Sequence, residues 1–250
     1  TMDPAPFPVS DIDGEGSSFT LKAGQLLESV RRVSYAIPQQ GGNATMSTMC
    51  LQAKDGQLNF VGLDGHVLAW DKVDYDGEFE LLIPKNTIDK LKALGLTGDV
   101  QISYSNTMAM FATDDFEVCT RLVEGTYFKY QKMFNELPLH TVVSRKELLD
   151  AMVRAKMCTA EKCPVRFEIS GKQLNLSIRD KVTDYHETVD LQEEISEALT
   201  IGFDARLVIE TLKAFDCDNV GISVNGPKMP MIVESEDSDF KAIVLPVSIN

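Results

Sequence analysis

Hydrophobic residues recur at helical spacing in four segments of the chain, residues 20–37, 85–94, 144–157 and 204–215. Such stripes are formed by Leu26, Val30, Val33 and Ile37 in the first segment and by Leu148, Met152 and Ala155 in the third. A spacing of three and four residues places side chains on one face of a helix. The pattern therefore predicts four helices, each with one buried face.

The same order of elements occurs twice, about 120 residues apart, which indicates an internal repeat. FTLKAGQLLESVRRV at residues 19–33 matches TVVSRKELLDAMVRA at residues 141–155, a short strand followed by a helix. GQLNF at residues 56–60 matches GKQLNL at residues 171–176, and in both a glycine-containing turn opens an alternating strand. Each half of the chain is thus expected to be one structural unit.

In both units the second helix follows a strand and precedes a meander of strands. These strands are LLIPKN at residues 81–86 and LTIGFD at residues 199–204. The meanders begin at residues 100–104 and 220–224 and close at residues 116–122 and 240–247. The order predicts an α+β fold of two repeated domains, each with two helices on one face of antiparallel sheets.

Composition divides the chain into three parts. Residues 1–18 are rich in proline, glycine and acidic residues, so we expect a linker or an expression remnant there. Ordered folding is expected to begin near Phe19, with domains at residues 19–136 and 137–250.

The net charge of −14 argues at first against nucleic-acid binding, which normally requires a basic surface. However, the four helical segments contain twelve Lys and Arg against six Asp and Glu, so they carry about +6 and the remainder about −20. A positive helical layer in an otherwise acidic protein can hold DNA on one face. Ordinary solvated helix faces remain the alternative.

Five cysteines are scattered among apolar neighbours, and only Cys158 and Cys163 lie close together, without a nearby histidine. We expect reduced core thiols and neither a metal nor a cofactor. No stretch approaches the roughly 20 apolar residues of a membrane span, and there is no secretion signal. We therefore expect a soluble, cytoplasmic protein.

Three motifs resemble those of the bacterial DNA polymerase III beta sliding clamp family, in its second and third domains. VGLDGHVLA at residues 61–69 is similar to the ATDGHRLA signature of the middle domain, and RLVEGTYFKY at residues 121–130 to the RLIEGxFPDY signature at its end. IVLPVSI at residues 243–249 is similar to the family's VMPMRL ending. Together with the repeat, the resemblance covers nearly everything from residue 19 to residue 250.

The resemblance implies a non-enzymatic processivity factor that tethers polymerases to duplex DNA. The family chain has three repeats and dimerises head to tail into a six-domain ring around DNA, and its partners include replicative and repair polymerases and the clamp loader. This chain contains two repeats, so we expect the first domain to be absent. Because that domain contributes to ring closure, we expect a monomer or a weak, non-native dimer.

The resemblance also implies a groove between the domains that takes a partner peptide carrying Leu and Phe side chains. The matching positions are Met46, Leu63, Gly65, His66, Val67, Leu68, Phe128, Lys132, Met133, Pro230, Met231, Ile243, Val244, Leu245, Pro246 and Val247. Leu63, Val67, Phe128 and Val247 depart from the family's usual Thr, Arg, Pro and Met. We expect an apolar slot with an altered rim. Plain core packing is the alternative for the strand residues.

Residues that face DNA are expected from two sources. The resemblance implies Lys85 and the loop at residues 39–43, in which Gln40 and Asn43 are the candidates. The charge count adds Arg32, Lys92, Arg145 and Arg154.

Two other classes of protein are alternatives to a clamp. An enzyme could use Asp64 and His66 as a carboxylate and a general base, but residues two apart on a strand share a face without being positioned to hydrogen-bond. No nucleophile elbow or phosphate loop is present, and His140 and His186 stand alone. The second alternative is a protein-interaction module of repeated α+β units that does not bind DNA.

Overall fold

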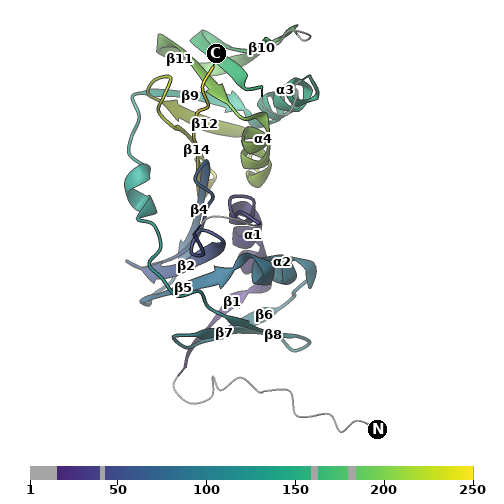
Figure 1. Ribbon diagram of the computed structural model, residues 1–250, viewed down its shortest axis with the longest axis vertical. Coiled ribbons are helices and arrows are strands. Elements are labelled where there is room, and N and C mark those ends of the chain that lie inside the picture. The colour runs from purple at the N-terminus through teal and green to yellow at the C-terminus, as the bar shows by residue number, and fades with distance from the viewer. Residues whose placement is uncertain (1–15, 40–42, 159–162, 180–183, 250) are drawn as a thin grey trace.

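The computed structural model describes residues 16–39, 43–158, 163–179 and 184–249. Two α+β units follow one another along the longest axis of the molecule, the N-terminal unit at the bottom of Figure 1 and the C-terminal unit at the top. The expected linker at residues 1–18 lies mostly outside the described residues, and the first strand begins at Ser17.

The elements of the first unit are β1 (Ser17–Lys22), α1 (Ala23–Ser34), β2 (Thr48–Lys54), β3 (Gln57–Leu63), β4 (Val67–Asp74), β5 (Phe79–Pro84), α2 (Lys85–Ala93), β6 (Asp99–Tyr104), β7 (Met108–Ala112) and β8 (Glu117–Arg121). The 3-10 helix η1 (Tyr130–Met133) lies in the connector to the second unit. That unit contains β9 (Leu139–Ser144), α3 (Arg145–Met157), β10 (Val165–Arg179), β11 (Asp184–Phe203), α4 (Ala205–Ala214), β12 (Asn219–Val224), β13 (Met231–Ser235) and β14 (Ser238–Val244).

All four predicted helices are present, and the main difference lies at the ends of α1. This helix begins at Ala23 rather than at residue 20, because residues 17–22 pair with β6 as a strand. The second unit begins its helices with capping side chains: Ser144 Oγ accepts a hydrogen bond from Glu147 N, and Asp204 Oδ1 accepts one from Arg206 N at 2.7 Å. Such caps satisfy N–H groups that have no partner within the helix.

Strand pairing joins the two units into one body. One sheet has the order β1-β6-β7-β8, and the other has the order β10-β11-β9-β12-β13-β14-β4-β3-β2-β5. The larger sheet crosses from one unit to the other where β14 pairs antiparallel with β4, with Ile243 opposite Leu68 and Val244 opposite Val67. This pairing fixes the orientation of the units.

The four helices lie on a common side of the sheets, on the right in Figure 1. Helices α1 and α4 meet across the junction, where Tyr35 Oη donates a hydrogen bond to Thr211 Oγ1 at 3.1 Å. Between the helices and sheets, one hydrophobic core runs through both units and includes Leu26, Phe60 and Phe167. The α+β fold of two repeated domains is thereby confirmed.

The connector, residues 123–137, crosses the other side of the sheet from the helices (Figure 1). Its Tyr127 and Tyr130 are buried in a second apolar cluster, and the Tyr130 ring lies 5.3 Å from the Trp70 ring. Tyr130 Oη also donates a hydrogen bond to Gln52 Oε1 at 3.0 Å. The sheet at the junction is therefore covered on both faces.

Candidate functional site

An apolar groove of about 210 Å³ opens at the junction of the two units. Its lining residues are Met46, Leu63, Gly65, His66, Val67, Leu68, Phe128, Met133, Ile243 and Leu245. All ten belong to the set expected to line a peptide groove, although they come from four separate segments of the sequence. The fold thus brings these positions together.

The turn between β3 and β4 forms one wall of the groove. Asp64 Oδ1 accepts hydrogen bonds from the backbone N–H groups of His66 and Val67, each at 2.8 Å, and Gly65 has a φ of +85°. A carboxylate that accepts from the next residues stabilises such a turn, and glycine adopts a positive φ with little strain. We expected Asp64 and His66 on a strand, but they lie in a turn. The Asp64 carboxylate accepts its hydrogen bonds from the backbone of that turn.

The C-terminal segment reaches this turn because Leu245 N donates a hydrogen bond to the carbonyl oxygen of His66 at 2.8 Å. Leu68 and Ile243, paired across the unit junction, are almost fully buried and form the floor of the groove. Phe128 is 52% exposed and Leu245 is half-buried, so the rim still presents apolar surface to water. Covering such surface with aliphatic or aromatic side chains is favourable.

Six expected groove residues do not line the groove: Lys132, Pro230, Met231, Val244, Pro246 and Val247. Successive side chains of a strand point to opposite faces, so Ile243 faces the groove while Val244 packs into the core on the helical side. Met231 is opposite Val244 in the sheet and is likewise buried. Val247 N donates to Gly202 O, which leads the terminal segment into the second unit.

A second, larger groove of about 810 Å³ lies on the helical side of the junction. Its basic residues are Arg31, Lys85, Lys92, Arg206 and Lys213, and its acidic residues are Asp64, Asp89 and Glu210. Cations from α1, α2 and α4 therefore surround one concave surface. A surface of this kind can accept an anionic chain such as a nucleic-acid backbone.

Lys85 and Lys92, both expected to face DNA, line this helical groove. Lys85 Nζ lies 2.5 Å from Asp89 Oδ1, and Lys92 Nζ donates a hydrogen bond to Ser34 Oγ at 2.8 Å. Partial burial lowers the pKa of Lys92, and the nearby positive charges of Lys85 and Arg31 lower it further. A bound anion would relieve this unfavourable clustering.

Arg32 occupies another environment than expected. Its side chain is 14% exposed, and Arg32 Nη1 lies 3.4 Å from Asp71 Oδ1 inside the unit junction. Arg32 Nη2 lies 2.6 Å from Glu28 Oε1, and the guanidinium carbon lies 5.9 Å from the centre of the Phe240 ring. Asp71, which is distant in sequence, and Glu28, one helical turn away, hold Arg32 at the unit junction, and its place on the DNA surface stays a prediction.

Three further expected DNA-facing residues, Asn43, Arg145 and Arg154, do not line the helical groove. Arg145 Nε donates to Cys217 O at 2.6 Å, and Arg154 Nε donates to Glu187 Oε2 at 2.9 Å. Asn43 is exposed at the start of a turn, where its side-chain oxygen accepts from Thr45 N. Gln40 lies outside the described residues.

Three basic residues of the helical groove were missed: Arg31, Arg206 and Lys213. Arg206 and Lys213 are seven residues apart on α4, which places them on the same helix face. That spacing is visible in the sequence and could have identified them. Arg31 adjoins Arg32, but only the fold reveals which of the two turns outward.

No group of three or more His, Cys, Asp or Glu side chains in the described part of the chain is arranged to hold a metal ion. The five cysteines all lie in described segments, and none is joined in a disulfide. Within the same segments, no helix combines the length and hydrophobicity needed to cross a bilayer.

Comparison with known proteins gives matches to both units. Residues 20–129 match the family model for the DNA polymerase III beta subunit, central domain, and residues 135–248 match the model for its C-terminal domain. A beta sliding clamp from Streptococcus pneumoniae is 26% identical over 209 residues, which are 78% of this chain. The chain spans 54% of the length of that relative.

Solved structures agree in fold. A putative DNA polymerase III beta subunit from Eubacterium rectale has a TM-score of 0.87 and 25% identity, covering 92% of this chain and 65% of that one. A sliding clamp from Pseudomonas aeruginosa bound to griselimycin has a TM-score of 0.90 and 23% identity, covering 97% of this chain and 68% of that one.

Proposed function

The chain belongs to the DNA polymerase III beta subunit family, and on that premise we propose that it supplies two domains of a sliding clamp, a non-enzymatic processivity factor. In this role the helical groove faces duplex DNA, and the apolar groove binds a peptide of a polymerase, the clamp loader or another partner. The two activities together tether the partner to DNA.

The observation that carries this proposal is the placement of the two grooves at one junction. The apolar groove lies on the connector side of the shared sheet. Leu68 and Ile243, which line it, belong to the second apolar cluster on that side. The cationic groove lies among the helices on the other side. A partner peptide and a DNA duplex could therefore be bound at the same time without competing for space.

The apolar groove suits a short peptide with aliphatic and aromatic anchors. Its floor is rigid because it consists of paired strands, and its rim carries the adaptable side chains of Met46 and Met133. Binding in such a pocket depends on a few buried anchors rather than on a large area. Leu245 is the best residue to alter, because its side chain is half-buried and lines the groove.

A titration of a fluorescent peptide of the Gln-Leu-x-Leu-Phe type tests the proposal. We expect saturable micromolar binding by the chain, competition by griselimycin, and loss of binding in Leu245→Asp. Met229→Asp is the matched control, because Met229 is an exposed apolar side chain outside the groove. Absence of binding, or equal binding by Leu245→Asp and the unaltered chain, would contradict the groove assignment.

The second candidate function is a protein-interaction module that does not bind DNA. The ion pair between Lys85 and Asp89 favours this candidate, because it neutralises part of the cationic surface. A clamp predicts salt-sensitive, sequence-independent contact with duplex DNA. Photo-crosslinking from the position of Lys213 to duplex DNA, at low and high salt, distinguishes the two. Crosslinks that are absent at low salt would favour the module.

A further inference from the structure

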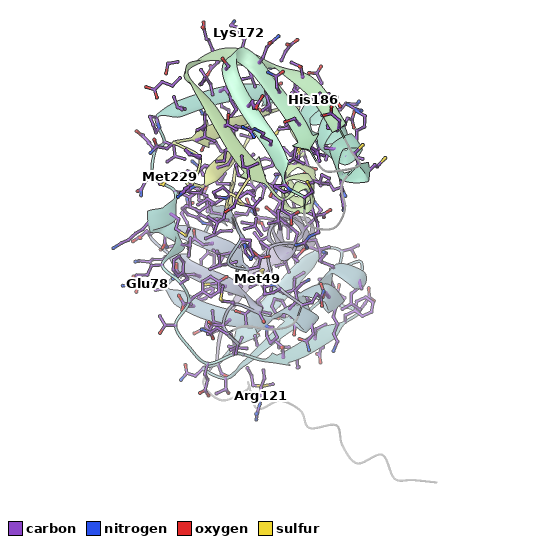
Figure 2. All side chains as sticks on the ribbon, turned by 45° about the horizontal axis from the view of Figure 1, so that its top comes forward. Met49, Glu78, Arg121, Lys172, His186 and Met229 are labelled. Atoms are coloured by element: carbon purple, nitrogen blue, oxygen red, sulfur yellow. The ribbon has the colours of Figure 1, made fainter. Side chains whose placement is uncertain are left out.

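A polar pocket of about 330 Å³ lies in the second unit, on the connector side of the shared sheet. Strands β9, β12, β13 and β14 contribute lining residues, and residues 134–137 of the connector form one wall. Figure 2 shows Met229, in the loop between β12 and β13, on the same side of the molecule as the connector. The polar pocket shares no lining residue with the apolar groove or the helical groove, so it is a separate cavity.

A row of directly opposed residues connects the polar pocket to the apolar groove. Leu68 of β4 lies opposite Ile243 of β14, which lies opposite Ile232 of β13. Ile232 in turn lies opposite Ser223 of β12, which lies opposite His140 of β9. Opposed residues point to the same face of a sheet, so this row changes from apolar at the groove to polar at the pocket. Neighbouring strands are about 4.8 Å apart, which places Ser223 about 10 Å from Ile243.

The next row on the same face leaves room for a ligand because it contains Gly221. Lys241 lies opposite Glu234, and Glu234 lies opposite Gly221. A Cβ atom at Gly221 would lie 2.9 Å from Cε1 of His140 and 3.6 Å from Cγ of Glu234. Both of these side chains line the pocket. The absence of a side chain at Gly221 therefore keeps the space between them open.

Hydrogen bonds position the polar groups of the pocket. His140 Nδ1 and Ser223 Oγ share a hydrogen bond at 3.0 Å, which holds the imidazole ring against β12. Lys241 Nζ donates to Glu234 Oε2 at 2.6 Å. The Lys241 and Glu234 side chains are 39% and 33% exposed, so a ligand can reach both. A carboxylate accepts several hydrogen bonds, and Glu234 can therefore bind a second donor.

The charge and shape of the pocket favour a guanidinium group. Two carboxylates, those of Glu136 and Glu234, line the pocket together with one ammonium group, that of Lys241. Phe134 also lines it, and the Phe134 ring is held by the Trp70 ring at 5.2 Å between ring centres. A guanidinium group has a planar surface that stacks on aromatic rings and several N–H groups that donate to carboxylates. An arginine side chain combines the features that the pocket can bind.

We propose that the polar pocket binds an arginine side chain of the partner segment whose apolar residues occupy the apolar groove. The inference rests on the proposed function, because it assigns a second subsite to the same partner. Met133 lines the groove and Phe134 lines the pocket, so the segment crosses the connector at these residues. An extended peptide covers about 3.3 Å per residue, so roughly three to five residues separate the arginine from the apolar anchors.

Fluorescence anisotropy with extended peptides tests the proposal. The Gln-Leu-x-Leu-Phe peptide is lengthened by about four residues at either end, and the added segment ends in arginine or, as the control, in glutamine. We expect one arginine peptide to bind about tenfold more tightly than its glutamine version. The difference should shrink as salt is raised, because the contact is partly exposed.

The short peptide separates failure of the pocket from failure of the groove. Binding of the short peptide, with equal affinities for each arginine peptide and its glutamine version, would overturn the polar pocket alone. Absence of binding by every peptide would contradict the apolar groove as well.

A substitution at Gly221 fills the pocket without changing its charge. The added Cβ atom of Gly221→Ala would meet side-chain atoms of His140, which is exposed and can turn away. We therefore expect an unchanged melting temperature and a smaller preference for the arginine peptide. An unchanged preference would contradict the placement of the guanidinium above Gly221.

Two further substitutions should change the arginine preference in opposite directions. Glu234→Gln removes a carboxylate that accepts from the guanidinium, so it should abolish the preference. Lys241→Met removes the cation that competes for Glu234, so it should increase the preference. Affinity for the glutamine peptide should stay the same in both variants, which a general loss of packing would not produce.

Glu236→Gln is the matched control for the loss of a carboxylate. Glu236 is exposed in the turn between β13 and β14 and does not line the pocket. This variant should keep the full arginine preference. A preference that survives in Glu234→Gln, or that falls equally in Glu236→Gln, would overturn the assignment of the pocket.

Discussion

Arg32 Nη1 lies 3.4 Å from Oδ1 of Asp71, whose carboxylate is almost fully buried in the junction between the two units. Removing one partner of a buried ion pair leaves the other charge uncompensated. We expect Arg32→Met to lower the free energy of unfolding by about 3 kcal/mol. Urea unfolding at neutral pH measures the loss. Arg31→Met is the control, because Arg31 makes an exposed ion pair with Asp216 and should cost much less.

The loss in Arg32→Met should depend on pH. Burial raises the pKa of Asp71, while hydrogen bonds and the charge of Arg32 oppose this rise, so the variant should have a still higher pKa. A carboxyl whose pKa is higher in the folded state binds its proton more tightly there, and stability therefore increases as the pH falls. The deficit should shrink as the pH is lowered from neutral through the raised pKa of Asp71, and Asp71→Asn should relieve part of it. A deficit independent of pH would contradict this explanation.

Phe128 should contribute to peptide affinity without contributing to folding. Its ring lines the apolar groove and is 52% exposed, so the unbound protein buries little of it. We expect Phe128→Ala to raise the peptide Kd about tenfold and to leave the unfolding midpoint nearly unchanged. Fluorescence anisotropy measures the first quantity and thermal unfolding the second. Unchanged affinity would place the peptide elsewhere in the groove.

We expect Lys92 to lower the stability of the folded chain and to contribute to DNA binding. Partial burial and the neighbouring charges of Lys85 and Arg31 lower its pKa, so its protonated form is disfavoured in the folded state. This lowers the free energy of unfolding at neutral pH. The effect disappears as the pH rises past the pKa that Lys92 has in the unfolded chain. Lys92→Met should therefore raise the melting temperature slightly and reduce DNA contact.

The DNA part of this prediction can be checked by salt dependence. If Lys92 neutralises one phosphate, its replacement should reduce the slope of log affinity against log salt by about 1. Lys146→Met is a control, because Lys146 is exposed on α3 and pairs with Asp150 outside the helical groove. Equal slopes for both variants would contradict the assignment of Lys92 to the DNA-binding surface.

The helices and the repeat could be predicted from the sequence because their signals are local. The stripe of Leu148, Met152 and Ala155 predicts the buried face of α3, and all three residues are buried. The groove could be located through the resemblance, since its motifs carry the turn at Gly65 and the strand at Ile243.

The direction of individual charges was harder to predict. Arg32 was assigned to the DNA surface from its place on a helix, but Asp71, 39 residues away in sequence, holds it in the junction. Strand alternation separates Ile243 from Val244, although both were assigned to the groove. The charge count could not place Arg32 because it has no information about the elements that pack against a helix, and the resemblance assigned adjacent strand residues to the groove without regard to the face on which each lies.

The close approach of β3 to α1 at Gly62 gives a prediction about the frame of the groove. A Cβ atom at this position would lie 2.5 Å from the backbone oxygen of Val33 and 3.0 Å from Ile37 Cγ1. The backbone oxygen cannot move without shifting the helix. We expect Gly62→Ala to lower the free energy of unfolding by about 1–3 kcal/mol.

Gly24→Ala is the matched comparison, because a Cβ atom at Gly24 meets nothing within 4 Å and the residue lies within α1. Alanine favours the helix over glycine by roughly 0.5–1 kcal/mol, so this variant should be more stable than the unaltered chain. The same substitution thus has opposite signs at the close contact between β3 and α1 and at an open position of α1. Urea unfolding of both variants measures the signs. A gain in stability at Gly62 would mean that α1 packs less closely on β3 than the structure indicates, and the part of the groove that Leu63 lines would then be less rigid.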